Sequence, residues 1–328
     1  MLIDLRSDTF TKPDEKMLYA MFRADVGDDV FDEDLTVKKL EQKTANYFGM
    51  DAGLFCPSGT MTNQIAIACH TNKGEEVICD TTSHVYLYEA GGIAFHSACQ
   101  VKLLQGDRGR LQAQQIREAI APNDLHKAKS TLVSIENTAN RGGGACYLLD
   151  ELESIQSVCK EHKLALHIDG ARLWNALIAK KQTPTDYGKI VDSISVCFSK
   201  GLGAPVGSVL LGSHAFIAHA KRTRKLFGGG MRQAGYLAAA CLYALENNIE
   251  RLEIDHYHAK QLEASLHQKE FIDTCLPVET NIVIANFKPN YSPVTFVEAL
   301  DKEGIKCIAI SSNQVRMVTH LDVDAKGI

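Results

Sequence analysis

Short apolar runs alternate with longer amphipathic stretches along the first three quarters of the chain. The apolar runs have the length of buried strands, and they span Ala52–Cys56, Glu76–Cys79, Thr131–Ile135, Leu164–Ile168, Ser193–Phe198 and Ser208–Leu211. Between two of them, Asp150 is a suitable helix N-cap and is followed by Leu152, Ile155 and Val158 at helical spacing. Strands that alternate with helices predict βαβ units and an α/β fold with a mainly parallel sheet.

The pattern changes after a long apolar helix predicted at Tyr236–Asn247. Beyond it, charged helices are predicted at Arg251–Glu263 and Thr295–Lys302, and short strands at Ile282–Asn286, Cys307–Ile310 and Val315–Thr319. We therefore expect a large α/β domain over residues 1–247, which includes the N-terminal segment, and a smaller α+β domain over residues 248–328.

The composition, with 45% apolar and 23% charged residues, is that of a soluble globular protein. The net charge of −5 provides no basic excess for a phosphate backbone, so no nucleic-acid partner is expected. Asp4, Arg6 and Asp8 interrupt the stretch where a secretory signal would need apolar residues. No run reaches the ~18 apolar residues of a membrane span. These features predict a cytoplasmic protein without a membrane partner.

The ten cysteines are scattered rather than paired in sequence, and several lie within apolar runs, among them Cys69, Cys197 and Cys241. No CxxC pair and no interleaved cysteine–histidine pattern is present, so no metal site is predicted. Free buried thiols in a reducing compartment are expected instead. His256 and His258 open a charged helix without a third ligand nearby, and we expect both to be exposed.

Two predicted strands end at residues that can carry chemistry. The stretch LALHIDGAR places Asp169 at the carboxyl end of a strand, where open α/β sheets bind ligands. The stretch DSISVCFSKG ends another strand near Lys200. Burying an ammonium group is costly, but a lysine held as an imine avoids most of that cost, and desolvation favours the nucleophilic amine. His167 shares a strand face with Asp169, and we expect it to pack or to support the site rather than to catalyse.

A strand–turn–helix at residues 52–70 is a candidate phosphate site. Ser58, Gly59 and Thr60 form the turn and offer N–H groups and two hydroxyls at a helix N-terminus, which suits a phosphate dianion. Such a turn can equally serve only to cap its helix. Together with an acid for a ring nitrogen and a lysine for an aldehyde, however, it predicts pyridoxal phosphate (PLP) as the cofactor.

Longer phrases make the chain resemble the threonine aldolase family, within the aspartate-aminotransferase-like fold type I of PLP-dependent transferases. The matching phrases are DLRSDTFTKP, ADVGDDVFDED, FCPSGTMTNQ, SHVYLYEAGG, ENTANRGGG, HIDGARLWNA, SKGLGAPVGSVL, RKLFGGGMRQAG, TNIV and VRMVTHLDV. They extend from residue 4 to residue 323, and SKGLGAPVGS and GGGMRQ are the most specific of them.

The resemblance implies a role for each matching residue. Lys200 would hold the cofactor as a Schiff base, and Asp169 would pair with the pyridinium nitrogen. His84 would stack on the ring, and His84 and His126 would lie near the substrate hydroxyl as candidate bases. The implied cofactor contacts are Ser58, Gly59, Thr60, His84, Asp169, Arg172, Lys200, Lys225 and Arg232, the last two supplied partly by a neighbouring subunit. The substrate carboxylate would be bound by Ser7, Arg172 and Arg316, because an arginine fork matches a carboxylate.

The activity implied is a retro-aldol cleavage of L-threonine or L-allo-threonine to glycine and acetaldehyde, in threonine catabolism and glycine biosynthesis. The enzyme would be a homo-oligomer, a dimer of dimers, with its active site at a subunit interface. Two alternatives stay open: another PLP-dependent reaction on a small amino acid, by β-elimination or transamination, and a PLP-binding protein without catalysis. The intact set of Lys200, Asp169, Arg172 and Arg316 argues against the last, because mere binding does not need a lysine nucleophile.

Three positions depart from the family pattern. Phe31 stands where a tyrosine is common, Leu35 where a proline is common, and Ala139 where a histidine is common. Phe31 lacks a hydroxyl that could line the substrate pocket, which bears on substrate preference. Ala139 is expected to change only the contacts that surround the site.

Overall fold

The computed structural model describes residues 2–328, and its central feature is a seven-stranded sheet. From edge to edge its strands are β2 (Ala52–Cys56), β8 (Ser208–Gly212), β7 (Ser193–Cys197), β6 (Ala165–Gly170), β5 (Ser130–Glu136), β3 (Glu76–Asp80) and β4 (Gln100–Leu104). Only β8 runs antiparallel to its neighbours, so the predicted α/β fold with a mainly parallel sheet is confirmed.

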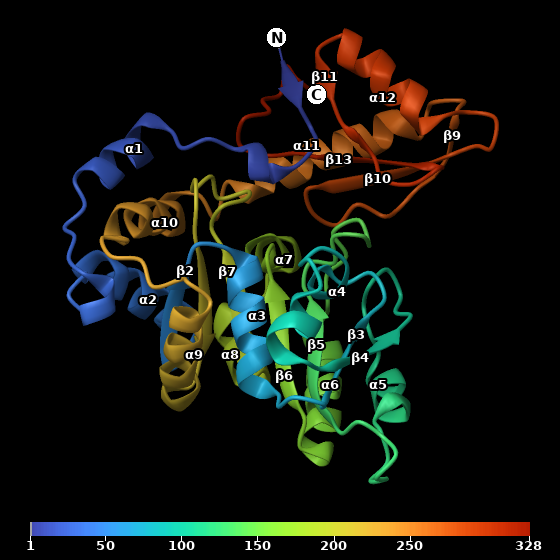
Figure 1. Cartoon of the computed structure of the whole chain (residues 1–328). Coiled ribbons are helices and arrows are strands. Elements are labelled where there is room, and N and C mark those ends of the chain that lie inside the picture. The colour runs from blue at the N-terminus through green and yellow to red at the C-terminus, as the bar shows by residue number, and fades with distance from the viewer. Residues whose placement is uncertain (1) are drawn as a thin grey trace.

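Helices cover both faces of this sheet (Figure 1). One face carries α3 (Gly59–His70) and α9 (His214–Leu226), whereas α2 (Leu35–Phe48), α6 (Leu149–His162) and α8 (Pro184–Ile190) pack together on the other. Strands β3, β7 and β8 are buried along their whole length, which explains why they lack the alternation of apolar and exposed polar residues seen in half-buried strands. The remaining helices of this part are α1 (Glu15–Phe22), α4 (His84–Leu87), α5 (Ala113–Ala119), α7 (Leu173–Lys180) and α10 (Gly235–Asn247).

Helix ends largely follow local sequence signals. Asp34 caps α2 by accepting from the Val37 N–H at 3.0 Å, and Gly49 ends that helix with a φ of 64°. The prediction of Asp150 as the N-cap of α6 is wrong, because the helix already begins at Leu149. Asp150 lies instead in the first turn, where its negative charge is favoured by the helix dipole.

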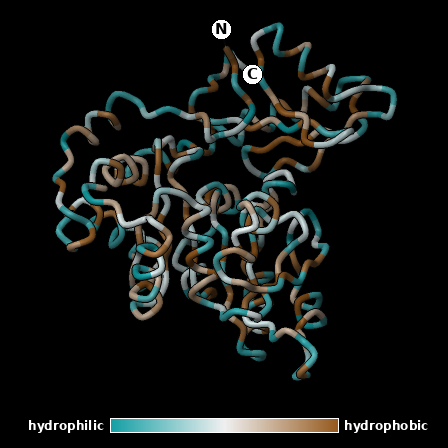
Figure 2. The backbone as a smooth tube through the Cα atoms, in the orientation of Figure 1, coloured by the Kyte–Doolittle hydropathy of each residue, from teal (hydrophilic) through white to brown (hydrophobic). Residues whose placement is uncertain are grey.

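The C-terminal quarter forms a smaller antiparallel sheet. Its order is β12 (Ile308–Ala309), β13 (Gln314–Val318), β10 (Ile282–Phe287) and β9 (Ile272–Cys275), and the helices α11 (Leu252–Leu266) and α12 (Pro293–Lys302) pack against it. Figure 2 shows hydrophobic segments in the strands of both parts and hydrophilic segments on the outer turns. The domain boundary near residue 247 stays a prediction.

The N-terminal segment, which we expected to belong with the large domain, contacts both parts of the chain: α1 packs against α10, whereas the first residues contact the C-terminal part. Strand β1 (Ile3–Asp4) pairs in parallel with β11 (Ile305–Lys306), and Leu5 lies in the apolar cluster of the C-terminal part. Strand β1 and the C-terminal end of the chain lie near each other beside α12 (Figure 1). Hydrophobic periodicity could not reveal this pairing, because its two strands are too short to carry a pattern.

The cysteines and the helix lengths bear on two expectations from the composition. All ten cysteines are free thiols, and eight of them are buried, which confirms the expectation of unpaired cysteines. Among residues 2–328, no helix combines the length and the hydrophobicity that crossing a membrane requires.

Candidate active site

Lys200 lies at the carboxyl edge of the large sheet, in the loop that follows β7. It lines two adjoining cavities of about 270 and 220 Å³. The Thr11 hydroxyl donates to the Lys200 carbonyl at 2.9 Å, which holds this loop in place. The Lys200 Nζ atom lies 3.5 Å from Cys197 Sγ, and no carboxylate of residues 2–328 forms an ion pair with it. Its amine is therefore available for chemistry.

The first turn of α3 borders the smaller cavity with Ser58, Gly59 and Thr60. Ser58 Oγ accepts from the Met61 N–H at 3.2 Å, so the serine caps the helix. The N–H groups of Gly59 and Thr60 have no acceptor within the helix and can bind an anion. A side chain at Gly59 would place its Cβ 2.6 Å from Cys197 Sγ, so this close approach requires glycine.

Asp169 is buried in β6 and faces the same cavity. Its Oδ2 accepts from Asn63 Nδ2 at 2.9 Å, and its Oδ1 accepts from the Ala171 N–H at 3.1 Å. These two donors fix the orientation of the carboxylate, which is the group that would hold a protonated ring nitrogen.

His84 opens α4 and borders both cavities. Its Nδ1 donates to Glu89 Oε1 at 2.9 Å, because a carboxylate can only accept. Burial disfavours the charged ring, but the hydrogen bond to Glu89 and the charge of Asp169 together raise the pKa of His84 above its ordinary value. The sequence analysis missed Glu89, although an acid within an otherwise apolar and aromatic stretch is a usable signal.

His84, Glu89 and Asp169 offer potential metal-ligand atoms within 4.8 Å of one another. Asn63 donates to both carboxylates, each at 2.9 Å, and His84 donates to one of them. These hydrogen bonds account for the grouping without an ion. The expectation of no metal site stays a prediction.

Arg172 forms a buried two-pronged ion pair with Asp8. Its Nε and Nη2 atoms lie 2.8 and 2.7 Å from the two Asp8 carboxylate oxygens. Burial opposes ionisation of Asp8, but Arg172 holds its pKa down at about 2. The Asp8 pair uses two of the five N–H donors of Arg172, so both donors of Nη1 and one of Nη2 remain for a ligand in the larger cavity.

Arg316, on β13, lines the larger cavity together with Ser7. Its Nη1 donates to Asn140 Oδ1 at 3.0 Å and its Nη2 to the Arg6 carbonyl at 3.1 Å. The Nε atom is buried without a hydrogen-bond partner among residues 2–328. Burial and the neighbouring Arg172 lower the pKa of Arg316 to about 10. A half-buried cation without a carboxylate partner is well suited to an anionic ligand group.

Glu136, at the end of β5, also lines the larger cavity and was not predicted. Its two oxygens accept from the backbone N–H groups of His84 and Asn140, each at 2.9 Å. Burial and the charge of Asp169 raise the pKa of Glu136 to about 7. This carboxyl can therefore hold or release a proton near neutral pH.

Comparison with known proteins adds to this geometry. The family described as beta-eliminating lyase matches residues 4–289. Low-specificity L-threonine aldolase 1 of Arabidopsis thaliana is 40% identical, over 99% of this chain and 93% of the relative. The low specificity L-threonine aldolase of Escherichia coli (strain K12) is 39% identical, over 100% and 96% of the two chains. The chain belongs to the low-specificity L-threonine aldolase family.

Solved structures confirm the fold of this threonine aldolase family member. The Leishmania major threonine aldolase aligns with a TM-score of 0.85 at 22% identity, over 99% of this chain and 96% of the other. A serine palmitoyltransferase of Sphingomonas wittichii aligns with a TM-score of 0.74 at 14% identity, over 99% and 84%. The predicted fold type I of PLP-dependent enzymes is thereby confirmed.

The structure does not bring His126 to the site that its own chain forms. His126 precedes β5, and residues that precede a parallel strand lie at the sheet edge opposite to the carboxyl ends of the strands. Its side chain is 91% exposed and contacts Asp124 at 2.8 Å. Within one chain of this threonine aldolase family member, His126 is therefore not a candidate base.

Lys225 and Arg232 likewise do not line the two cavities beside Lys200. Lys225 borders a separate hollow with Val30 and Gly230, and Arg232 forms an exposed ion pair with Asp28 at 3.0 Å. A contact between these cations and a cofactor phosphate would have to come from a second copy of the chain. The sequence analysis expected such a partial contribution from a neighbour.

The three departures from the threonine aldolase pattern lie outside the cavity lining. Phe31 is 70% exposed, with the Arg232 guanidinium 5.9 Å from its ring centroid, and Leu35 is also exposed. Phe31 therefore cannot affect the substrate pocket of its own chain. Ala139 is buried and pairs with Ala145 in an isolated β-bridge near the site.

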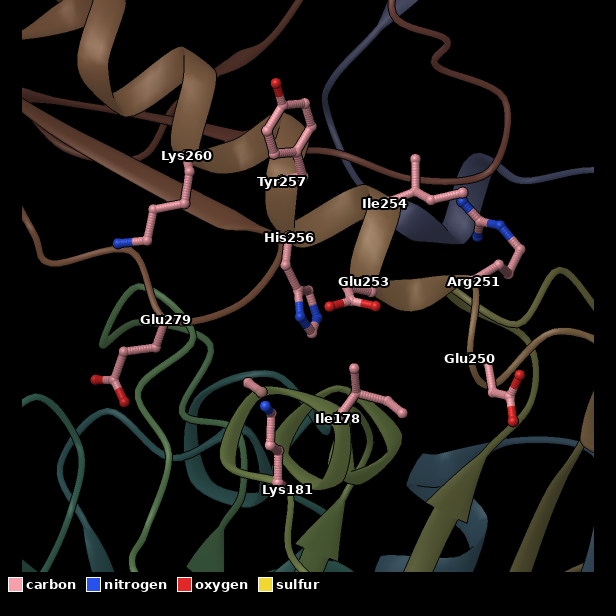
Figure 3. A pocket seen from close by; sticks show the side chains of 11 residues that line it. Ile178, Lys181, Glu250, Arg251, Glu253, Ile254, His256, Tyr257, Lys260 and Glu279 are labelled. Atoms are coloured by element: carbon pink, nitrogen blue, oxygen red, sulfur yellow. The ribbon is translucent and has the colours of Figure 1, made fainter.

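A larger cavity of about 840 Å³ lies between α7 and α11, away from Lys200. Figure 3 shows His256 pointing from α11 toward Ile178 and Lys181 at the end of α7. Its charges are of mixed sign, and Lys200 is absent from its lining, so the residues suited to chemistry line the two cavities of about 270 and 220 Å³ instead. The predicted exposure of His258 is wrong, because that side chain is buried. His256 is only partly buried, and its Nε2 lies 3.2 Å from Asn175 Nδ2.

Proposed function

We propose that this chain is a PLP-dependent carbon–carbon lyase that cleaves L-threonine and L-allo-threonine to glycine and acetaldehyde. The observation that carries the proposal is one cavity lined by both Lys200 and Arg316. Lys200 has no carboxylate partner among residues 2–328, and Arg316 has a buried Nε without an acceptor. An amine nucleophile beside an uncompensated cation suits an α-amino acid. The names of the relatives at about 40% identity support this substrate class.

The residues around the smaller cavity fit PLP. The first turn of α3 offers N–H groups for the phosphate, and Asp169 offers a carboxylate for the ring nitrogen. Gly59 has no side chain, so it leaves open the space beside Cys197 that a Cβ atom would occupy. Lys200 offers the amine for the aldehyde. A neighbour in the fold, a serine palmitoyltransferase, was solved with PLP. When bound, PLP supplies an electron sink for the bond that breaks beside the amino-bearing carbon.

Arg316, Arg172 and Ser7 bind and orient the substrate carboxylate in this proposal. Both arginines line the cavity and keep N–H donors beyond those that bind Asn140, the Arg6 carbonyl and Asp8. A carboxylate fixed at two points leaves one orientation for the rest of the substrate. Such positioning aligns the bond to be broken and accounts for a large part of the rate in comparable enzymes.

His84 and Glu136 are the residues of this chain that can take the proton of the substrate hydroxyl. Both line the cavity that contains Lys200. Glu89 holds the hydrogen on Nδ1 of His84, so the neutral ring presents its other nitrogen, Nε2, as an acceptor. Glu136 has a pKa of about 7 and can accept a proton near neutral pH. General-base assistance of this kind is typically worth ~10²–10⁴-fold in rate.

We further propose a cytoplasmic homo-oligomer, a dimer of dimers, in which neighbouring copies complete the site. Lys225, Arg232 and His126 lie outside the cavities of their own chain, which supports a contribution between copies. Large apolar side chains at the surface support an interface, and those at least 70% exposed are Phe22, Phe31, Phe95, Leu125 and Leu226. Its metabolic role would be threonine catabolism and glycine formation.

The description of the matching family as beta-eliminating lyase favours a second candidate, β-elimination from the same site. The two reactions differ in their products. The PLP-loaded protein should release glycine and acetaldehyde in equal amounts from L-threonine and L-allo-threonine, and Lys200→Ala should abolish this release. Release of keto acid and ammonia in place of glycine would show β-elimination rather than aldol cleavage. A purified protein that binds no PLP would refute both.

A further inference from the structure

A line of buried hydrogen bonds runs through the large sheet behind the proposed site. His70 Nε2, on α3, lies 2.8 Å from Ser193 Oγ on β7. The same oxygen lies 2.8 Å from His167 Nδ1 on β6. The other nitrogen of that ring, Nε2, lies 3.2 Å from Asn63 Oδ1 on α3. Ser193, His167 and Asn63 are buried from solvent, so each must find its partner within the protein.

Asn63 connects this line to the two acids of the site. Its Nδ2 lies 2.9 Å from Asp169 Oδ2 and 2.9 Å from Glu89 Oε1. Two carboxylates accept hydrogen bonds, so the amide nitrogen must face them and the amide oxygen must face His167. An amide oxygen accepts in turn, and the hydrogen of the neutral His167 ring must therefore be on Nε2.

The remaining bonds follow from the charge states of the two histidines. Burial and the neighbouring His70 lower the pKa of His167 to about 3, and burial lowers that of His70 to about 4, so both rings are neutral near pH 7. Nδ1 of His167 then carries no hydrogen and accepts from the Ser193 hydroxyl. Ser193 accepts in its turn from His70 Nε2. Every donor in the line points toward the carboxylates, so the bonds polarise one another in the same direction.

We propose that His167 is a positioning residue for the reaction, which holds the Asn63 amide in the one orientation that bridges Asp169 and Glu89. The inference rests on the proposed function, because Asp169 is the acid expected to face the PLP ring nitrogen. The bridge places N–H donors between two adjacent carboxyl groups and offsets the repulsion between them. Glu89 also accepts from His84, so the same bridge fixes the geometry of that ring beside the substrate.

A pair of substitutions separates positioning from simple packing. His167→Gln places an N–H donor near the position of Nε2 and keeps the bond to Asn63. His167→Asn places its amide near the position of Nδ1 and loses that bond. The readouts are the equilibrium affinity of the apoprotein for PLP, the absorption spectrum of the bound cofactor, and kcat and KM for L-threonine. The melting temperature of each apoprotein reports any loss of packing.

His167→Asn should bind PLP roughly tenfold more weakly, because a hydrogen bond to charged groups is disrupted. It should also shift the absorption spectrum and lower kcat, with KM changed less than about twofold because Arg316 is untouched. His167→Gln should retain an affinity within about threefold of the parent and an unchanged spectrum. Equal effects of the two substitutions, or an unchanged affinity and spectrum in His167→Asn, would overturn the proposal.

The tautomer of His167 can be measured in the parent apoprotein, without any substitution and without PLP. Nitrogen-15 spectra of the histidine-labelled parent apoprotein should show His167 with its hydrogen on Nε2. A hydrogen on Nδ1 would overturn the inference. Failure of the parent to bind PLP would instead refute the proposed function, whereas failure of this inference alone leaves PLP binding by the parent intact.

Discussion

Replacing Asp8 by asparagine should destabilise the protein strongly, because it leaves the Arg172 guanidinium buried without a counter-charge. The Asp8 side chain is fully buried, and that of Arg172 is only 7% exposed. Asn281 donates to Asp8 Oδ2 at 3.2 Å and cannot replace its charge. Asparagine keeps the size of Asp8 and one oxygen acceptor, so the loss comes from the charge rather than from a cavity.

The pKa shift of Asp8 and the typical cost of breaking a buried ion pair bracket the size of this loss. The pKa of Asp8 falls from 3.8 to about 2, and at about 1.4 kcal/mol per pH unit this corresponds to about 2 kcal/mol of stability at neutral pH. Removing one partner of a buried ion pair typically costs about 3–5 kcal/mol. We expect Asp8→Asn to lower the free energy of unfolding by about 2–5 kcal/mol.

The effect should depend on pH in a defined direction. Because the pKa of Asp8 is lowered by folding, its contribution is fully present above pH 3.8 and is lost as the pH falls toward 2. Urea unfolding of the apoprotein, followed by circular dichroism, should show a constant difference from parent between pH 8 and 5 and a smaller one below pH 4. Asp4→Asn, which removes a carboxylate paired with Arg6 nearer the surface, is the matched control. The reasoning fails if Asp8→Asn is no more destabilising than Asp4→Asn, or if acid leaves their difference unchanged.

Other predictions test the cavities and one further buried group. Arg316→Gln should raise KM for L-threonine by ~10–100-fold with a smaller effect on PLP affinity, since a charged hydrogen bond to the carboxylate is lost; an unchanged KM in steady-state assays would contradict this. Gly59→Ala should weaken PLP binding more than tenfold in equilibrium titration, because its Cβ would lie 2.6 Å from Cys197 Sγ, whereas Gly327→Ala should bind like the parent. Burial lowers the pKa of His256 from 6.5 to about 4, so this neutral histidine contributes stability above pH 6.5 that is lost as the pH falls toward 4. Between pH 7 and 5 the free energy of unfolding should therefore fall by about 2 kcal/mol less in His256→Gln than in the parent. Equal falls in denaturant titrations would refute the lowered pKa of His256.

The residues predicted correctly to lie together share a local signal. Lys200 and Asp169 each stand at the end of a buried strand, and the turn at Ser58 follows one and opens a helix. In a parallel sheet the carboxyl ends of the strands share one edge, so residues at the ends of adjacent strands can be predicted to lie near each other. Glu136 follows the same rule at the end of β5, and the sequence analysis overlooked a signal that was present.

Other parts of the site depend on contacts that no local pattern encodes. The pairing of Asp8 with Arg172 joins residues 164 positions apart, and it uses two of the five N–H donors of a guanidinium that was expected to bind ligands. The family resemblance gave His126 a role without stating which copy of the chain supplies it. Edge strand β4 escaped prediction because its alternating, partly exposed residues do not form a continuous apolar run.

The pairing of β1 with β11 has a consequence for the order in which this enzyme is made. Residues 3–4 leave the ribosome about 300 residues ahead of their partners, residues 305–306. Thr11, just downstream, bonds the carbonyl of Lys200. A nascent chain can thus complete its large sheet before the β1–β11 pairing forms. Until then the segment that carries Thr11, which bonds the Lys200 loop, lacks its contact to the C-terminal part. A chain truncated near residue 300 should therefore form a nearly intact large sheet but lack the β1–β11 pairing that lies just upstream of the Thr11 contact to the loop of Lys200.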